Sequence, residues 1–370
     1  LYNFLKMVKE DDANGNGIDD EIPMTGFIGG WASDPTVWMM NSFTQCVNPL
    51  SNTNPTVAGG LVVNNGKIEY AVMKDEYRDG LRYMHKLFEE GLLDNQTFLQ
   101  DNTQFSATMD ASEGNKVAVY ANGGVENSEF WQQVDGEWQN WEILAPVAGP
   151  DGVRYSGRCI QTYFEGCLGV VSSTCKYPEI VVALFDFMAS EDAAHHIGGG
   201  PEGISWEYTN EGVSLSGGTP AYEQFTVPED FDYVKEGGLP KAYANYRYTP
   251  DAMIQRGSAE YRGGLKIEDP SHSTEYWFQQ CAELYSQYAP DVNTLVPNLS
   301  FEGEDAKIVT EGTLTIGGYV NQALVQFIDG SLDIEKDWDA YIERLESMGV
   351  DEYVAAYQRT YDAYMEAQGK

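Results

Sequence analysis

The chain has 370 residues, with 22 Lys and Arg against 58 Asp and Glu, which gives a formal net charge of −36 at pH 7. A surface this acidic repels nucleic-acid phosphates and anionic headgroups, so we expect no nucleic-acid or membrane-surface partner, and self-repulsion favours a monomer. Hydrophobic residues form 42% of the chain, and no run approaches the ~20 apolar residues of a membrane-spanning helix, so we expect a folded protein of about two domains.

The first part of the sequence predicts alternating helices and strands. Leu1, Leu5 and Val8 at helical spacing predict a first helix, which ends in an acidic loop. Next come a hairpin around Asn64-Asn65-Gly66, an amphipathic helix over 75–93, and strands over 117–121 and 141–147. Gly149-Pro150-Asp151-Gly152 then predicts a strong break.

After this break the sequence predicts a strand over 166–173 and a helix that begins at Pro178. Residues 202–270, rich in Gly, Tyr, Pro and Asp, predict long loops with short elements. The remaining sequence has helical periodicity over 275–288, 317–329, 335–347 and 351–366. This order of elements predicts an α/β protein with a helical C-terminal section.

The most informative motif is the acidic loop Asp11-Asp12-Ala13-Asn14-Gly15-Asn16-Gly17-Ile18-Asp19-Asp20-Glu21. Ca²⁺ takes about six to eight oxygen ligands from a loop that coils around it. Only the register that starts at Asp12 has oxygen side chains at alternate positions, because Ala13 and Gly15 interrupt the other register. The motif predicts a structural Ca²⁺ site formed by Asp12, Asn14, Asn16, the Ile18 carbonyl, Asp20 and Glu21.

This loop differs from an EF-hand loop, which has a bidentate Glu at its twelfth position, where this sequence has Pro23. Asp20 and Glu21 close the shell earlier, so we expect a shorter calcium loop whose ion stabilises the loop and catalyses nothing. The alternative is an acidic, Asn- and Gly-rich turn that binds no metal.

The loop and further segments together resemble the family 1 extracellular solute-binding proteins of ABC transporters. The resemblance is to the long calcium-loop subgroup, which includes alginate-oligosaccharide-binding proteins and many Gram-positive lipoproteins. It extends over essentially the whole chain. The matching segments are 4–9 and 22–23 around the loop, 77–93, 116–119, 174–179, 184–187, 200–204, 327–334 and 338–341.

The resemblance implies a two-lobed, type II periplasmic-binding-protein-like fold whose α/β lobes close over a ligand. Residues 1–147 would form the second, C-terminal-type lobe with the calcium loop, and 148–215 would return to the first lobe. Residues 216–370 would form loops and then helices that pack mainly on the second lobe. Family members carry a signal peptide, a lipid-anchored Cys and most of the first lobe ahead of the matching segments, so we expect an N-terminally incomplete chain.

For function, the resemblance implies the substrate-binding component of an ABC importer. Such a protein captures an oligosaccharide between its lobes and delivers it to the transmembrane permease subunits without performing chemistry. It implies an extracellular, cell-surface lipoprotein, anchored through a segment upstream of Leu1.

Sugar recognition needs flat aromatic faces for sugar rings and planar polar groups for hydroxyls. Four tryptophans in loop contexts are candidate stacking residues, with packing as the alternative role for each: Trp31, Trp38, Trp131 and Trp206. Arg154 and Arg158 beside Tyr163 are candidates to hold an acidic sugar or a pair of hydroxyls, with surface ion pairs as the alternative. The resemblance alone adds Asn122 and Glu202 as cleft residues.

The enzyme alternative is a secreted glycosidase or lyase acting on acidic glycans. The sequence contains no GxSxG, Walker or HExxH motif, and its four histidines form no metal-ligand pattern. With 58 acids a carboxylate pair can always be proposed, so its presence indicates nothing. A calcium-dependent adhesion module is a second alternative, although such modules usually repeat the calcium loop that occurs once here.

The five cysteines, Cys46, Cys159, Cys167, Cys175 and Cys281, include no CxxC pair. This spacing argues against a zinc site and a disulfide framework. One bridge within the region from Cys159 to Cys175 stays open as an alternative.

Overall fold

The computed structural model describes residues 1–30, 32–45, 60–109, 115–123, 141–156, 170–190, 193, 195, 202–225, 263–268 and 274–369. The chain divides into two compact units, of which unit 1 comprises Leu1–Tyr163 with Gln280–Lys370 and unit 2 comprises Phe164–Gln279. Among the described residues, no helix has the length and apolar character needed to cross a bilayer. The assignment of residues 1–147, 148–215 and 216–370 to lobes stays a prediction.

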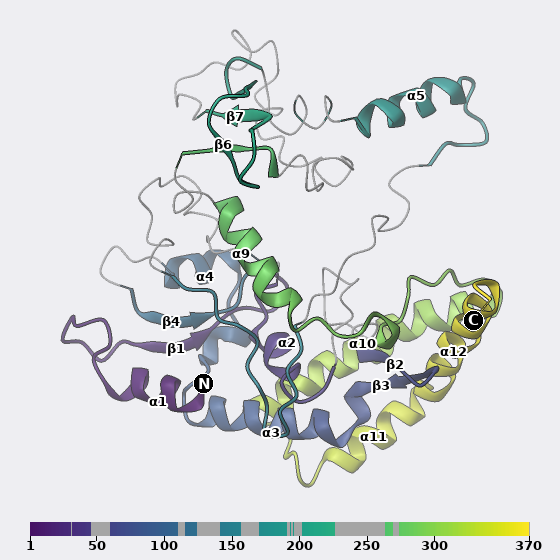
Figure 1. Ribbon diagram of the computed structural model, residues 1–370. Helices are drawn as coiled ribbons and strands as arrows, with labels where there is room; N and C mark the ends of the chain where they lie inside the picture. Colours follow the sequence, from purple (N-terminus) through teal and green to yellow (C-terminus); the bar gives the residue numbers. More distant parts are fainter. Residues whose placement is uncertain are drawn as a thin grey trace. The chain divides into compact units, whose positions relative to one another are not determined.

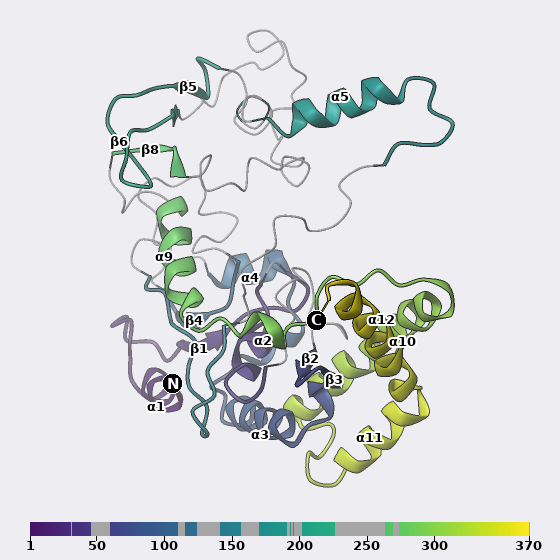
Figure 2. The same ribbon diagram turned by 45° about the vertical axis from the view of Figure 1, so that its right-hand side comes forward.

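A parallel pair of strands forms one layer of unit 1. β1 (Ile22–Thr25) pairs with β4 (Val117–Tyr120), and Thr25 lies opposite Tyr120. Figures 1 and 2 show this pair between α1 (Tyr2–Glu10) and α4 (Asn102–Thr108). Because the strands run in the same direction and in register, the loops that follow them leave from the same edge of the pair.

The predicted hairpin is confirmed. β2 (Leu61–Asn64) and β3 (Lys67–Tyr70) pair antiparallel around Asn65 and Gly66, which have φ of +49° and +80°. Positive φ at both central residues is what a two-residue type I′ turn requires, and Asn-Gly supplies it at low cost.

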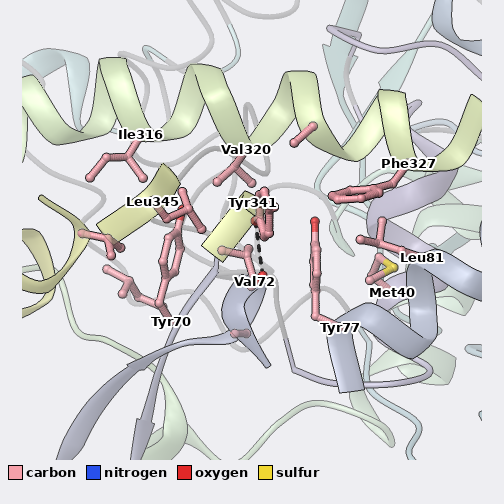
Figure 3. Close-up of a cluster of buried hydrophobic side chains, with 14 of the residues drawn as sticks. Met40, Tyr70, Val72, Tyr77, Leu81, Ile316, Val320, Phe327, Tyr341 and Leu345 are labelled. Carbon is pink, nitrogen blue, oxygen red and sulfur yellow. Dashed lines mark hydrogen bonds between the residues drawn. The ribbon is translucent and has the colours of Figure 1, made fainter. Parts of the chain in front are cut away.

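The main core of unit 1 lies where this hairpin meets a set of helices: α3 (Asp75–Glu89), α10 (Gly303–Asp329), α11 (Trp338–Ser347) and α12 (Val350–Ala367). Helix α10 packs against α3 and α12. Figure 3 shows α10 side chains above those of α3 and the 3₁₀ turn η2 (Ala71–Met73), where the buried Tyr341 hydroxyl donates to the Val72 carbonyl at 3.2 Å. Short elements complete the unit: α2 (Pro35–Met40), η3 (Asn95–Phe98) and η10 (Val292–Thr294).

Unit 2 contains α5 (Pro178–Met188) and short antiparallel strands. β5 (Trp206–Tyr208) pairs with β7 (Tyr222–Gln224), and β6 (Val213–Ser214) pairs with β8 (Lys266–Ile267). The chain passes from unit 2 to unit 1 at Gln280, within helix α9 (Thr274–Ser286). Cys175 carries a free thiol, and Cys159 lies outside the described residues.

Three predicted elements differ from the structure. The segment 141–147 forms no strand, because its carbonyls bind side chains instead of a neighbouring strand: Ser42 Oγ donates to Val147 at 2.8 Å and Tyr285 donates to Leu144 at 2.8 Å. Helix α10 begins at Gly303 instead of 317, and the added part buries Val309, Gly312 and Ile316. The predicted strand over 166–173 is absent from its described part, 170–173.

Candidate functional site

The acidic loop of residues 11–21, which we call the Asp/Asn loop, lies between α1 and β1 and coils around its own side chains. Asp12 accepts from the backbone N–H of Asn16 at 3.0 Å and of Gly17 at 2.9 Å, and Asn16 Oδ1 accepts from the N–H of Ile18 at 2.7 Å. Gly15 and Gly17 have φ of +73° and +78°, which a residue with a side chain rarely adopts. The alternation of oxygen side chains with glycines thus produces a tight coil, as the sequence predicts.

Asp20 closes this coil and connects it to the strand pair. Its Oδ1 accepts from Asn16 Nδ2 at 3.2 Å, and its Oδ2 lies 3.1 Å from Nζ of Lys116. The hydrogen bond from Lys116 is the largest cause that holds the pKa of Asp20 below its ordinary value. Lys116 directly precedes β4, and its carbonyl accepts from the N–H of Ile22 at 2.8 Å. The loop is therefore joined to the end of the strand pair where β1 and β4 begin.

The donor set of the loop suits a hard cation, since every predicted ligand offers oxygen and none offers sulfur or imidazole. Glu21 accepts from the N–H of Asn14 at 3.4 Å, and the Ile18 carbonyl accepts from the N–H of Asp20 at 3.1 Å. The described residues contain no group of three or more His, Cys, Asp or Glu arranged to hold a metal, so a cation here would depend on the Asn amides as well.

A second candidate site is the opposite edge of the pair, where β1 and β4 end. Ligands of α/β proteins bind outside the carboxyl ends of parallel strands. The loop after β1 is tight, with the N–H of Phe27 donating to the Ser33 carbonyl at 2.8 Å. A Cβ on Gly30 would lie 2.1 Å from the Phe27 ring, so this turn requires glycine. After β4 the Oδ1 of Asn122 accepts from the N–H of Gly123 at 2.9 Å.

A buried polar network holds this edge. Gln100 Nε2 donates to the Gly26 carbonyl at 2.6 Å and to Thr25 Oγ1 at 3.1 Å. Thr25 Oγ1 donates to Asp94 Oδ2 at 2.9 Å, and the N–H of Asp94 donates to the Met24 carbonyl at 2.8 Å. The network fixes the point where the chain leaves β1, and the sequence analysis missed it because no local motif marks it.

An aromatic pair completes the edge. Trp141 meets Tyr120, the last residue of β4, edge-on, with ring centroids 4.7 Å apart and an interplanar angle of 82°. Both side chains are half-buried and rest on the small core formed by Phe27, Phe105, Met109 and Val117. The sequence around Trp141 predicts a strand, and no local signal marks Trp141 as a site residue.

The predicted site residues are dispersed. Asn122 lies at the edge just described, whereas Trp38 lies in α2, packed against the main core. The guanidinium of Arg154 lies over the Tyr288 ring at 3.9 Å, and its Nε donates to the Pro146 carbonyl. Four predicted residues lie outside the described residues: Trp31, Trp131, Arg158 and Tyr163.

In unit 2, Trp206 has no exposed surface. Its ring stacks on buried His195 at 4.8 Å between centroids, and Tyr222 meets the same imidazole edge-on at 4.5 Å. Glu202 is exposed and bridges to Trp206 through the backbone. The structure thus places Trp206 in the small core of unit 2, and the ligand-binding roles of Trp206 and Glu202 stay predictions.

The fold is that of the type II periplasmic-binding-protein-like solute-binding proteins, which confirms the predicted class. An extracellular solute-binding protein from Bifidobacterium longum subsp. infantis superimposes with a TM-score of 0.69 at 20% identity, over 98% of this chain and 68% of that one. An EF-hand mutant of FusA from S. pneumoniae, in complex with fructo-nystose, gives 0.64 at 21% identity over 99% and 68%. Alginate-binding protein AlgQ2 without calcium ion gives 0.63 at 18% identity over 98% and 67%.

The sequence comparisons confirm the resemblance to ABC-transporter substrate-binding proteins. The chain is 23% identical over 367 residues to the fructooligosaccharide ABC transporter substrate-binding protein FusA of Streptococcus pneumoniae serotype 4, covering 98% of this chain and 61% of FusA. It is 22% identical over 371 residues to lipoprotein LipO of Bacillus subtilis, covering 98% and 64%. The chain thus spans less than two thirds of the length of either relative. No family model matches it.

Proposed function

We propose that this protein is the substrate-binding component of an ABC importer and that it captures an oligosaccharide. The observation that carries this proposal is the similarity to FusA, which runs through 98% of the chain and coincides with a shared fold. Its partners are then a sugar ligand and the transmembrane subunits of a permease. Both relatives are named as transporter components or lipoproteins, which supports a cell-surface location.

The edge of β1 and β4 has the chemistry that such a ligand needs. The half-buried rings of Tyr120 and Trp141 offer apolar faces to sugar C–H groups, and Asn122 supplies an amide beside them. The hydrogen bond from Gln100 to the Gly26 carbonyl fixes the point where the chain leaves β1. A position that is fixed before binding loses less entropy on binding. Binding of this kind involves no chemical step, in agreement with relatives that are binding proteins.

We further propose that the Asp/Asn loop binds one structural Ca²⁺ through Asp12, Asn14, Asn16, the Ile18 carbonyl, Asp20 and Glu21. The oxygen-only donor set supports this proposal, as do the descriptions of two similar structures, an EF-hand mutant of FusA and AlgQ2 without calcium ion. Because Lys116 ties the loop to the start of β4, the ion would act at the end of the strand pair away from Asn122. Its role is therefore to stabilise the loop.

A thermal-shift panel of oligosaccharides in the presence of Ca²⁺, followed by mass spectrometry of the same wells, tests the function. A ligand that binds only the folded state raises the melting temperature by mass action. A rise with intact sugar is the expected result. Recovery of shortened sugar would overturn the proposal in favour of a glycosidase or lyase, and a panel without any shift would remove the sugar ligand.

A further inference from the structure

We infer that Trp141 is a stacking residue at the ligand-binding edge and that this edge selects uncharged sugars over uronic-acid sugars. The inference rests on the proposed function and adds to it the charge class of the ligand. Its two parts depend on separate observations, the placement of an aromatic pair and the distribution of charge along the segments that build the edge.

The placement of Trp141 follows from the end of β4. Tyr120 is opposite Thr25 in the parallel register, so its ring stands where both strands end. Trp141 meets that ring edge-on at 4.7 Å, and Phe105 also packs on Tyr120, at 6.3 Å between ring centroids. Phe27, from the loop after β1, meets Phe105 at 5.1 Å. The indole thus packs on Tyr120 and the small core and stays half-buried, which suits stacking against a sugar ring.

The segments that build this edge carry no cation. Residues 22–45, 94–109, 117–123 and 141–153 contain no Lys, Arg or His. Their charged residues are all acids: Asp34, Asp94, Asp101, Glu142 and Asp151. A carboxylate accepts hydrogen bonds from sugar hydroxyls, but it repels the carboxylate of a uronic acid.

The nearest basic residues in sequence are already paired with other groups. Lys116 pairs with Asp20 at the end of the strands where β1 and β4 begin. Arg154 lies over the Tyr288 ring at 3.9 Å and donates to the Pro146 carbonyl. The total charge of −36 adds a long-range repulsion that slows the approach of any anionic sugar. Within the described part of this edge, neither local nor long-range charge favours a uronic acid.

The test is calorimetric titration of the 370-residue protein in Ca²⁺ with two sets of probes. One set is neutral, namely cello-, malto- and fructo-oligosaccharides, and the other is acidic, namely oligogalacturonates and oligomannuronates. We expect a neutral sugar to bind with an affinity that changes little between low and high salt. Preferential binding of a uronic-acid sugar that weakens with salt would overturn the assignment of charge class.

Three variants test the indole with the neutral sugar that binds best. We expect Trp141→Leu to weaken binding about tenfold, Trp141→Phe to retain part of it, and Tyr364→Leu, which removes a 38% exposed ring from α12, to leave it unchanged. A matched melting temperature for the three proteins shows that they fold. If wild type and Trp141→Leu bind equally, the stacking role is wrong while the proposed function stands. If wild type binds no sugar of either set, the proposed function and this inference both fail.

Discussion

Lys116 Nζ lies 3.1 Å from Asp20 Oδ2, and this ion pair joins the Asp/Asn loop to the residue that directly precedes β4. The carbonyl of the same lysine accepts from the N–H of Ile22, so one residue contacts both ends of the segment that links loop and strand. The order of the loop is therefore coupled to the parallel strand pair. Calcium binding to the loop, or a substitution in it, should change the stability of unit 1.

The first prediction concerns the proposed calcium. Asp12→Ala together with Asn14→Ala removes two oxygen ligands, and also two acceptors of the N–H of Asn16. We expect the melting temperature of this variant to fall in Ca²⁺ and to change much less in EDTA, because the metal stabilises only a folded protein that can bind it. Differential scanning calorimetry in both buffers measures the two shifts.

Asp11→Ala is the matched control for that experiment. It removes the same charge from the neighbouring position, and Asp11 is outside the predicted ligand set. Its melting temperature should depend on Ca²⁺ as that of wild type does. An equal fall in the melting temperature of the double variant in both buffers would show that hydrogen bonds alone hold the loop. It would contradict the proposed calcium site.

The pairing of Asp20 with Lys116 predicts a pH dependence. The Lys116 ammonium holds the pKa of the Asp20 carboxyl below its ordinary value. A carboxyl whose folded pKa is depressed stabilises the protein above its unfolded pKa, about 3.9, and loses that contribution as pH falls through the folded pKa. We expect Lys116→Met to melt below wild type at pH 7, and the two melting curves to converge below about pH 4.

The Asp20→Asn variant, and the variant that combines it with Lys116→Met, complete a double-mutant cycle for this ion pair. Many acids titrate over the same range, so only the coupling between the two sites isolates their interaction. The coupling free energy between Lys116 and Asp20 should be measurable at pH 7 and absent in acid. A coupling that does not change with pH would mean that the two side chains contact each other without an electrostatic interaction.

Gln100 is predicted to be a positioning residue for the loop after β1. Gln100→Leu leaves the buried Gly26 carbonyl without its donor, which costs about 1–3 kcal/mol in the free energy of unfolding. Urea denaturation measures this loss, and titration with the sugar found in the panel measures its effect on affinity. Gln96→Leu, at an exposed position four residues earlier, is the control and should change neither quantity. Stability loss with unchanged affinity would restrict Gln100 to a structural role.

Local signals were sufficient for part of this fold. The hairpin around Asn65-Gly66 and the Asp/Asn loop were predictable because residues a few positions apart define each turn. The roles of Gln100 and Trp141 were not, since Gln100 meets Thr25 across 75 positions and Trp141 depends on where β4 ends. Which strands are neighbours is a property of the assembled fold, and one sequence carries little information on it.

Trp206 illustrates the same limit. Its Gly-bounded sequence context leaves a ligand-facing role and a packing role open, and in the structure its ring stacks on His195 and meets Tyr208 edge-on. The local sequence indicates that the chain can turn near Trp206. The burial of its side chain depends on which residues from other parts of the chain pack against it. The resemblance predicted the fold class over the whole chain, yet it could not assign the contacts of individual side chains.

Because α10 packs closely on α12, we expect two Gly→Ala substitutions in α10 to change the free energy of unfolding in opposite directions. A Cβ at Gly312 would lie 2.3 Å from the Tyr353 ring, whereas Gly318 of the same helix has nothing within 4 Å. Gly318→Ala should raise the free energy of unfolding by about 0.5–1 kcal/mol, the usual gain for Ala over Gly within a helix. Gly312→Ala should lower it by about 1–3 kcal/mol, because the methyl group must displace a buried tyrosine.

Urea denaturation of both variants measures the two changes, and near-ultraviolet circular dichroism reports whether Tyr353 has moved. The helix propensity gain is common to both positions, so the difference between them isolates the contact of α10 with α12. If Gly312→Ala stabilised the protein as much as Gly318→Ala, the two helices could separate without cost. The close approach at Gly312 would then contribute nothing to the core that supports β3, whose Tyr70 ring lies 6.4 Å from that of Tyr353.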